Sequence, residues 1–185
     1  MLFRYSLFVW QKQTTVKIFG SYPYPPNIYE DNTIEFINVF VKEGKTIHMP
    51  WEIKEHSKLT QDEWRNLSMQ TWPMYPADVK RAGGHPCPFP LELPLRLIRM
   101  YTFKQVAKLD FCGDIVLDMF NGTGATCLAA QALGRHFIGV DLNAEYCAIA
   151  QNRLQTEAVD PRAIFLEPIR VARGRQEENK KETNP

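Results

Sequence analysis

The stretch DIVLDMFNGTGAT, at residues 114–126, decides the fold class of this 185-residue chain. It opens with a short apolar run that ends in a carboxylate, which predicts a buried strand over Asp114–Asp118. Gly122 and Gly124 come next, and an alanine-rich helix is predicted over Thr123–Leu133, ending at the following glycine. Glycines between a strand and a helix let the backbone turn sharply and approach a ligand closely.

A second strand and a second helix follow this loop. The sequence predicts the strand over His136–Asp141 and the helix over Asn143–Leu154, with Asn143 as its N-cap. Asp141 follows the glycines by about 20 residues, where nucleotide-binding folds place a carboxylate for ribose hydroxyls. The order strand, loop, helix, strand, helix predicts an α/β protein that contains half of a doubly wound parallel sheet.

The residue patterns in the N-terminal third of the chain predict strands rather than helices. Tyr5–Gln11 is apolar, and Thr33–Lys42 alternates with β-branched and aromatic residues, so each is expected to form a strand. Gly20 and three prolines predict a loop over residues 20–32, because they interrupt both helices and strand ladders. The polar C-terminal residues 174–185 are expected to form a disordered tail.

The middle of the chain is less regular. Residues 43–84 carry mixed charges and predict only one short helix, over Gln61–Leu67. A further helix is expected to begin near Pro94, because proline is favoured in the first helical turn. From the helical period, its apolar residues Leu97, Ile98 and Tyr101 are predicted to share one face.

The composition sets outer limits on function. The chain is 44% hydrophobic with a formal net charge of +1, which fits one globular domain and gives no overall attraction to nucleic acid. The N-terminal apolar run is too short to cross a membrane. The four cysteines contain no C-x-x-C pair, so we expect buried thiols in a reducing compartment and no metal site: Cys87, Cys112, Cys127 and Cys147.

The loop and its acidic partner predict a ligand that carries adenosine. A loop that binds a dinucleotide such as NAD usually has a third small residue, which allows the helix to pack closely on the strand. Cys127 occupies that position here, and cysteine is small enough that NAD is not excluded as the ligand. The alternative without a ligand is a tight turn in which Asp141 is a surface charge or a helix cap.

The segment from residue 116 to residue 154 resembles the S-adenosylmethionine-binding half of DNA amino-methyltransferases, which methylate adenine N6 or cytosine N4. The family's loop, Asp-x-Phe-x-Gly-x-Gly, is matched by Asp118, Phe120, Gly122 and Gly124. Its following strand and helix are matched by Gly139, Asp141, Tyr146, Ala150 and Arg153. The segment HPCPFP at residues 85–90 resembles the His-Pro-x-x-Phe-Pro element that precedes the loop in the permuted (beta) group. The resemblance runs from about Trp10 to Leu154.

The resemblance implies a partial doubly wound, Rossmann-like methyltransferase sheet over residues 1–173, with S-adenosyl-L-methionine as cofactor and double-stranded DNA as partner. It implies that Asp118 accepts from the cofactor's ammonium group and Asp141 from the ribose hydroxyls. It also implies that Phe89 and Phe120 form apolar walls near the sulfonium. For each phenylalanine, packing in the hydrophobic core is an alternative reason for its presence. His85 is expected to be a hydrogen-bonded structural residue. The implied cofactor-binding residues are His85, Phe89, Asp118, Phe120, Asn121, Gly122, Thr123, Gly124, Thr126, Asp141 and Asn143.

The chemistry of this family needs a part that the 185 residues do not contain. The family activates the acceptor amine with Asp/Ser/Asn-Pro-Pro-Tyr/Phe, and no such tetrapeptide occurs here, so no catalytic residue is identified. Tyr24-Pro25-Pro26-Asn27 has no carboxylate or amide at its first position and is interpreted as a stiff loop. We therefore expect a C-terminal portion, with the missing strand lying between the glycine-loop strand and Tyr5–Gln11 and leaving two open inner edges. A second polypeptide is then expected to supply that strand, unless the chain is a remnant.

Sequence recognition is expected in the variable segment at about residues 43–84. Basic residues lie there among tryptophans, either for contacts with phosphates and bases or as a solvated face over a small tryptophan core: Lys54, Lys58, Arg65, Lys80, Arg81, Trp51, Trp64 and Trp72. Three functions remain: part of a DNA amino-methyltransferase of restriction–modification or orphan type, a non-catalytic binding remnant, and a small nucleotide-dependent oxidoreductase. A cytoplasmic, prokaryotic-type location is expected, without membrane contact.

Overall fold

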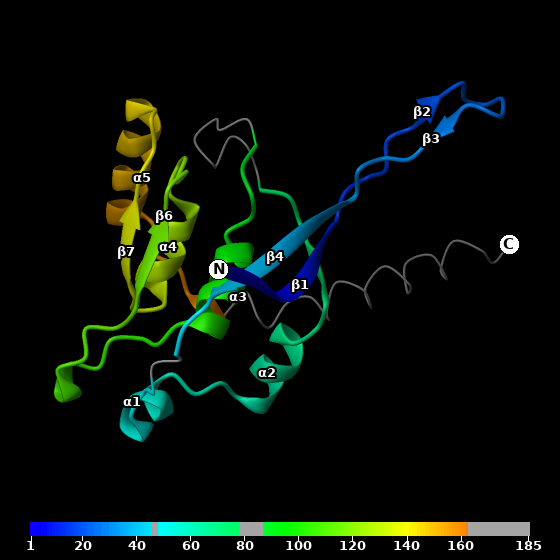
Figure 1. The fold of residues 1–185 in the computed structure, drawn as a ribbon. Coiled ribbons are helices and arrows are strands. Elements are labelled where there is room, and N and C mark those ends of the chain that lie inside the picture. Colours follow the sequence, from blue (N-terminus) through cyan, green and yellow to red (C-terminus); the bar gives the residue numbers. More distant parts are fainter. Residues whose placement is uncertain (46–47, 78–86, 163–185) are drawn as a thin grey trace, which may run out of the picture.

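The computed structural model describes residues 1–45, 48–77 and 87–162. Figure 1 shows two groups of strands on either side of helix α3. The elements in chain order are β1 (Leu2–Lys12), β2 (Phe19–Gly20), β3 (Ile28–Tyr29), β4 (Ile34–Lys42), α1 (Trp51–His56), α2 (Gln61–Leu67), β5 (Thr71–Met74), α3 (Glu92–Tyr101), a 3-10 turn (Ala107–Leu109), β6 (Ile115–Asp118), α4 (Ala125–Ala132), β7 (His136–Gly139) and α5 (Ala144–Thr156).

The first sheet has the strand order β4-β1-β5. β1 pairs antiparallel with β4 along almost its whole length and parallel with β5 at its C-terminal end, from Val9 opposite Thr71 to Lys12 opposite Met74. The strands predicted over Tyr5–Gln11 and Thr33–Lys42 are confirmed. β5 was not predicted, because a four-residue strand that contains a proline gives little periodic signal.

The second sheet consists of the parallel pair β6 and β7, joined by α4 and followed by α5. The predicted order of strand, loop, helix, strand and helix is confirmed, and so is the N-cap: Asn143 Oδ1 accepts from the backbone N–H of Glu145 at 2.8 Å. The prediction of a buried strand is wrong, because Ile115 and Leu117 are 62% and 57% exposed. The core covers only the face of this sheet that carries Val116 and Phe137.

Helix α3 joins the two sheets. Leu93 and Leu97 pack against the core of the first sheet, which contains Phe8, Trp10, Trp72 and Met74. Leu95 and Ile98 pack against Ala129 and Ala130 of α4, beside the second sheet. Leu97, Ile98 and Tyr101 lie on one side of the helix, as the helical period predicts, but they do not pack into one core. Leu97 and Ile98 belong to different cores, and Tyr101 is exposed. Pro94 lies in the first turn, as expected, where its missing N–H has no intrahelical partner.

The open strand edges differ from the prediction. β1 has a neighbour on each side, so the expectation that the Tyr5–Gln11 strand forms an open inner edge is wrong. Within the described residues the first sheet ends at β4 and β5, and the second ends at β6 and β7. The expected exposed apolar surface is present on the second sheet, at Ile115, Leu117, Ile138 and Val140.

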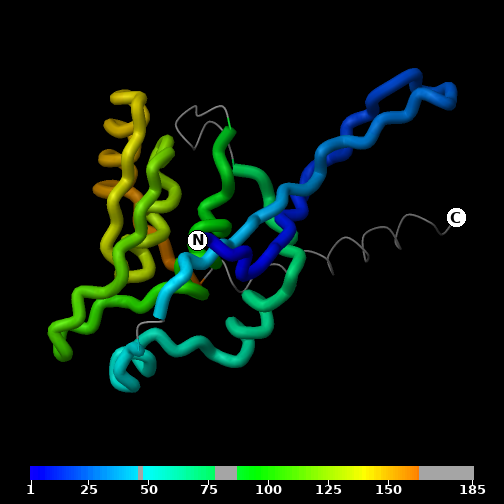
Figure 2. The backbone as a smooth tube through the Cα atoms, viewed as in Figure 1, coloured from blue at the N-terminus to red at the C-terminus, as the bar shows by residue number. Residues whose placement is uncertain are grey.

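A two-stranded arm extends away from the body between β1 and β4 (Figure 2). The loop predicted over residues 20–32 is correct except for the two-residue strands β2 and β3, which pair antiparallel. The segment Tyr24-Pro25-Pro26-Asn27 lies between these two strands, and the Tyr24 side chain is exposed. This position is consistent with a loop.

The segment between β4 and β5 is more regular than expected. α2 has the predicted bounds, and α1 precedes it. Trp72 lies in the main core, whereas Trp51 and Trp64 are exposed, so the three tryptophans form no separate small core. Lys58 pairs with Glu55 and Arg65 with Asp62, while Lys80 and Arg81 lie outside the described residues. DNA contact by this segment stays a prediction.

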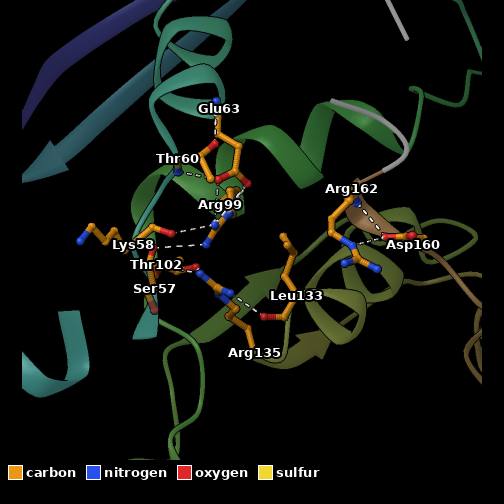
Figure 3. A network of polar contacts seen from close by, with 10 residues as sticks. All are labelled: Ser57, Lys58, Thr60, Glu63, Arg99, Thr102, Leu133, Arg135, Asp160 and Arg162. Atoms are coloured by element: carbon orange, nitrogen blue, oxygen red, sulfur yellow. Dashed lines mark hydrogen bonds and ion pairs between the residues drawn. The ribbon is translucent and has the colours of Figure 1, made fainter. Parts of the chain in front are cut away.

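A polar network fastens α2 to α3 (Figure 3). Thr60 and Glu63 form a reciprocal capping box at the start of α2, and Arg99 of α3 donates to Glu63 Oε1 from Nη2 at 3.2 Å and to the carbonyl oxygen of Ser57 at 3.2 Å. Burial alone would raise the pKa of Glu63, but the backbone N–H of Thr60 and the Arg99 guanidinium together hold it below its usual value. The segment between β4 and β5 is thus held to the core through a charged contact.

A buried arginine fastens the second sheet to the end of α3. Arg135 donates to the Thr102 hydroxyl at 2.9 Å and to the carbonyl oxygen of Leu133 (Figure 3). Burial, with a contribution from the nearby Arg99, lowers the pKa of Arg135 to about 10. No helix in the described ranges is long and apolar enough to span a bilayer.

Candidate cofactor-binding site

The loop between β6 and α4 is held in a tight backbone conformation. Gly122 and Gly124 have φ angles of 51° and 86°, which are unfavourable for residues with a side chain. The backbone N–H of Asn121 donates to the carbonyl oxygen of Val140 at 2.9 Å, so the loop continues the ladder to the neighbouring strand. The N–H of Gly124 donates back to the carbonyl oxygen of Asn121 at 2.9 Å, which closes the turn before α4 begins.

Asp141 holds this loop from the neighbouring strand end. Its Oδ2 accepts from the backbone N–H of Gly122 at 2.7 Å, and its Oδ1 accepts from that of Asn143 at 2.9 Å. Both are charge-assisted hydrogen bonds, which are stronger than bonds between neutral groups. Asp118 acts similarly at the start of the loop, where Oδ1 accepts from the N–H of Phe120 at 3.0 Å. A carboxylate oxygen can accept more than one hydrogen bond.

The loop also packs tightly against α5 and β7. A Cβ atom at Gly124 would lie 2.7 Å from the Cβ of Ala150, and one at Gly139 would lie 2.7 Å from the Sγ of Cys127. The Cys127 thiol donates to Asn121 Oδ1 at 3.1 Å. Burial, and then the charge of Asp118, raises the pKa of Cys127 to about 11, so the group stays a protonated thiol at neutral pH. These contacts assign Cys127 a packing role.

A cavity of about 670 Å³ opens over the loop. One wall is the loop itself, the second is the segment that leads into α3, and the third comes from the end of α5 and from the residues after β5. Among the described residues the lining consists of Tyr75, Pro76, Ala77, Cys87, Pro88, Phe89, Pro90, Leu91, Phe120, Asn121, Gly122, Thr123, Ala125, Arg153 and Glu157. The cavity therefore joins segments that lie far apart in the sequence.

The structure brings only some of the predicted site residues into this cavity. Those that line it are Phe89, Phe120, Asn121, Gly122 and Thr123. The others are not among the lining residues. Asp118 and Asp141 accept from backbone N–H groups of the loop, Gly124 and Asn143 are the N-cap residues of α4 and α5, and Thr126 lies in the first turn of α4. His85 lies outside the described residues. Phe120 is 85% exposed, so core packing does not explain its presence, whereas Phe89 also contacts the first core.

Arg153 and Glu157 form a polar wall that the sequence interpretation did not assign to the site. The Arg153 Nη1 donates to the carbonyl oxygen of Thr123 at 2.8 Å. Its Nε and Nη2 donate to the two carboxylate oxygens of Glu157 at 2.7 and 3.2 Å. Arg153 matches the family motif, but nothing in the sequence connects its side chain with the loop carbonyl. It fixes the loop to α5.

Comparison with known proteins places the chain in a family. The family model for DNA methylases that act on adenine N6 or cytosine N4 matches residues 2–152, so the chain belongs to this family. Two curated relatives are the type II methyltransferases M.BglI from Bacillus subtilis, 33% identical over 123 residues, and M.MthZI from Methanothermobacter thermautotrophicus, 31% identical over 161 residues. The matches cover 66% and 79% of this chain but only 31% and 42% of those relatives.

Solved structures support the same fold. TTHA0409 from Thermus thermophilus, in a crystal structure with S-adenosyl-L-methionine, is 31% identical with a TM-score of 0.63, covering 83% of this chain and 53% of the other. The cytosine-N4-specific PvuII DNA methyltransferase is 20% identical with a TM-score of 0.56, covering 88% of this chain and 55% of the other. The architecture is therefore part of a Rossmann-like methyltransferase sheet.

Proposed function

We propose that the cavity over the glycine loop binds S-adenosyl-L-methionine. Its volume of about 670 Å³ lies within the usual range for small-molecule pockets, and Phe89 and Phe120 give it apolar walls. The cofactor carries no phosphate, so a loop that offers backbone and small residues is better suited to it than a cradle of cations. The single observation that carries the proposal is this cavity, built on the family's Asp-x-Phe-x-Gly-x-Gly loop.

The residues have distinct parts in this binding. Gly122 and Thr123 bring backbone to the ligand, while Arg153 and Glu157 keep the loop closed against α5. Asp141 and Asp118 do not line the cavity, but each accepts from the backbone N–H of a residue that does, Gly122 and Phe120 respectively, so both carboxylates lie next to it. In this proposal Asp141 accepts from the ribose hydroxyls and Asp118 from the ammonium group of the cofactor. When bound, the cofactor supplies the methyl group to be transferred.

We infer that the chain forms the cofactor-binding and DNA-recognition portion of a site-specific DNA amino-methyltransferase, of restriction–modification or orphan type, in the cytoplasm. The substrate is double-stranded DNA, methylated at adenine N6 or cytosine N4. The tetrapeptide that activates the acceptor amine is absent from the 185 residues, so it belongs to another part of the protein or to a second polypeptide. The absence of this tetrapeptide also favours a second candidate, a module that binds cofactor or DNA without catalysis.

Calorimetry with S-adenosylhomocysteine and NAD tests the ligand assignment. We expect saturable binding of one S-adenosylhomocysteine per chain and no heat from NAD. Binding of NAD alone would reject the cofactor and favour a nucleotide-dependent oxidoreductase. S-adenosylhomocysteine is used because it lacks the reactive methyl group but keeps the adenosine and amino-acid portions that the cavity is expected to contact.

Substitution of Arg153 tests how the loop is held. Arg153→Met removes the hydrogen bond to the Thr123 carbonyl oxygen and the ion pair with Glu157, so we expect the affinity for S-adenosylhomocysteine to fall by about tenfold or more. The matched control is Arg65→Met on α2, because within the described ranges Arg65 pairs with the exposed Asp62 and is not among the residues that line the cavity. Equal affinities for the two variants in calorimetry would contradict the assigned role of Arg153.

A further inference from the structure

The cavity over the glycine loop lies at the N-terminal ends of two helices, α3 and α4. Leu91 is the N-cap of α3 and lines the cavity, together with Phe89 and Pro90 before it. Another wall is the glycine loop, which ends at Gly124, the N-cap of α4. The separation of these two walls therefore depends on how the two helices pack against each other.

The C-terminal ends of the same helices meet at one buried side chain, that of Arg135 (Figure 3). Thr102 and Leu133 are the C-cap residues of α3 and α4. Arg135 is 5% exposed, and its Nη2 donates to the carbonyl oxygen of Thr102 at 2.6 Å and its Nε to the Thr102 hydroxyl at 2.9 Å. Its Nη1 donates to the carbonyl oxygen of Leu133. One guanidinium thus joins both C-caps, so the two helices run in the same direction.

The two helix ends compensate the buried charge of Arg135. Carbonyl groups at the C-terminal end of a helix carry a partial negative charge, so a cation beside them is stabilised. Within the described ranges the atoms that accept from Arg135 are all uncharged oxygens. The carboxylate of Asp114, which is nearby, accepts from the backbone N–H of Phe103 at 2.7 Å. A planar guanidinium presents its donors in fixed directions, which the ammonium group of lysine does not.

Between their two ends the helices touch through small side chains. Leu95 and Ile98 of α3 pack against Ala129 and Ala130 of α4, and both alanines are 0% exposed. Because α3 has 10 residues, a tilt of roughly 4° about one end moves the other end by about 1 Å. The groups of a binding site have to be held to within about 0.5 Å of their productive positions. A small change at the C-caps is therefore large enough to alter the cavity.

We propose that Arg135 is a positioning residue for cofactor binding: by joining the C-caps of α3 and α4, it fixes the separation of the two cavity walls at the other end of these helices. The assignment rests on the proposed function, because the ligand whose affinity it controls is the one assigned to the cavity. Arg135 is not among the residues that line the cavity, so it acts through the two helices. Arg153, in contrast, contacts the loop directly at Thr123.

The test is calorimetry with S-adenosylhomocysteine on variants that change these contacts in graded steps. Arg135→Lys keeps the charge without the planar donors, and Arg135→Met removes both, so each is expected to weaken binding by about tenfold or more. Thr102→Val removes the hydroxyl that accepts from Nε and is expected to weaken binding by about threefold. Thr102→Ser keeps that hydroxyl and is expected to keep the affinity. Unchanged affinity in folded Arg135→Lys, Arg135→Met and Thr102→Val would overturn the proposal.

Two further measurements distinguish positioning from a general loss of stability. Leu67→Ala removes a buried side chain of α2 that does not line the cavity, so it is expected to lower the melting temperature without changing the affinity. In NMR spectra without ligand, Arg135→Lys and Thr102→Val are expected to shift the backbone amide signals of Gly122 and Thr123. Shifts confined to the C-terminal ends of α3 and α4, or an equal loss of affinity in Leu67→Ala, would show that Arg135 only stabilises the fold.

The same samples separate this inference from the proposed cofactor. If the unsubstituted chain and the folded variants bind S-adenosylhomocysteine equally well, the role of Arg135 is wrong and the cofactor assignment stands. If the unsubstituted chain binds none, the cofactor assignment is wrong, and the spectra without ligand still decide whether Arg135 controls the cavity walls. If the Arg135 variants do not fold, the comparison of Thr102→Val with Thr102→Ser decides the question.

Discussion

The isolated 185-residue chain is expected to bind S-adenosylmethionine but to transfer no methyl group above background from the tritiated cofactor to unmethylated duplex DNA. The physical reason is the acceptor: the lone pair of an exocyclic amine is delocalised into the base, so the nitrogen has to be held and activated. The family tetrapeptide that does this is absent from the sequence. Adding a polypeptide that carries a strand ending in Asp-Pro-Pro-Tyr is expected to raise the rate by at least ~10³-fold, through orientation of the nitrogen toward the methyl group.

The control for this experiment is the same polypeptide with its aspartate replaced by alanine, which is expected to restore no activity. The described structure offers places where a strand can add, because β4 and β6 each have a neighbour on only one side. Apolar side chains on the second sheet, such as Ile115 and Leu117, are also left uncovered. Methylation by the isolated chain at the complemented rate would show that the acceptor is activated by residues within it.

Asp141→Asn is expected to lower the affinity for S-adenosylhomocysteine by about 100-fold, because it weakens two charge-assisted hydrogen bonds at once. The carboxylate accepts from the N–H groups of Gly122 and Asn143, at 2.7 and 2.9 Å. An amide has one oxygen, so one of these donors then faces an NH₂ group. The loop loses its anchor to the neighbouring strand end, and the ribose loses a charged acceptor. Calorimetry on the purified variant measures the change.

Asp160→Asn is the matched control. Asp160 also accepts from a backbone N–H, that of Arg162 at 2.9 Å, but it is exposed and lies outside the cavity wall. Its substitution is expected to leave the affinity unchanged. If both variants bound S-adenosylhomocysteine as tightly as the parent chain, the Asp141 carboxylate would have no part in holding the ligand or its loop.

The sequence predicted the loop region well because its signals are local. The apolar run before the loop, the positive-φ glycines and the N-cap at Asn143 all act within a few residues of one another. The position of Asp141 followed from spacing alone. What spacing did not reveal is that its carboxylate binds the backbone of Gly122, because such a contact depends on how two strand ends meet in space.

The hydrophobic period of a segment cannot predict its contacts with segments that lie far away in the sequence. The helical period placed Leu97 and Ile98 on an apolar surface, but it cannot tell that α3 lies between two cores and sends one side chain to each. Tyr75 belongs to no motif, and its place in the cavity wall depends on the pairing of β5 with β1. Arg153 reaches Thr123 across 30 residues, a contact that only the fold creates.

A crystal structure with S-adenosylhomocysteine tests most directly whether the cavity over the glycine loop holds S-adenosylmethionine. We expect density for the ligand between Phe89 and the loop, in contact with the backbone at Gly122 and Thr123. Clear density for the ligand at another surface, or a cavity that stays empty beside Asn121 at a saturating concentration, would contradict it.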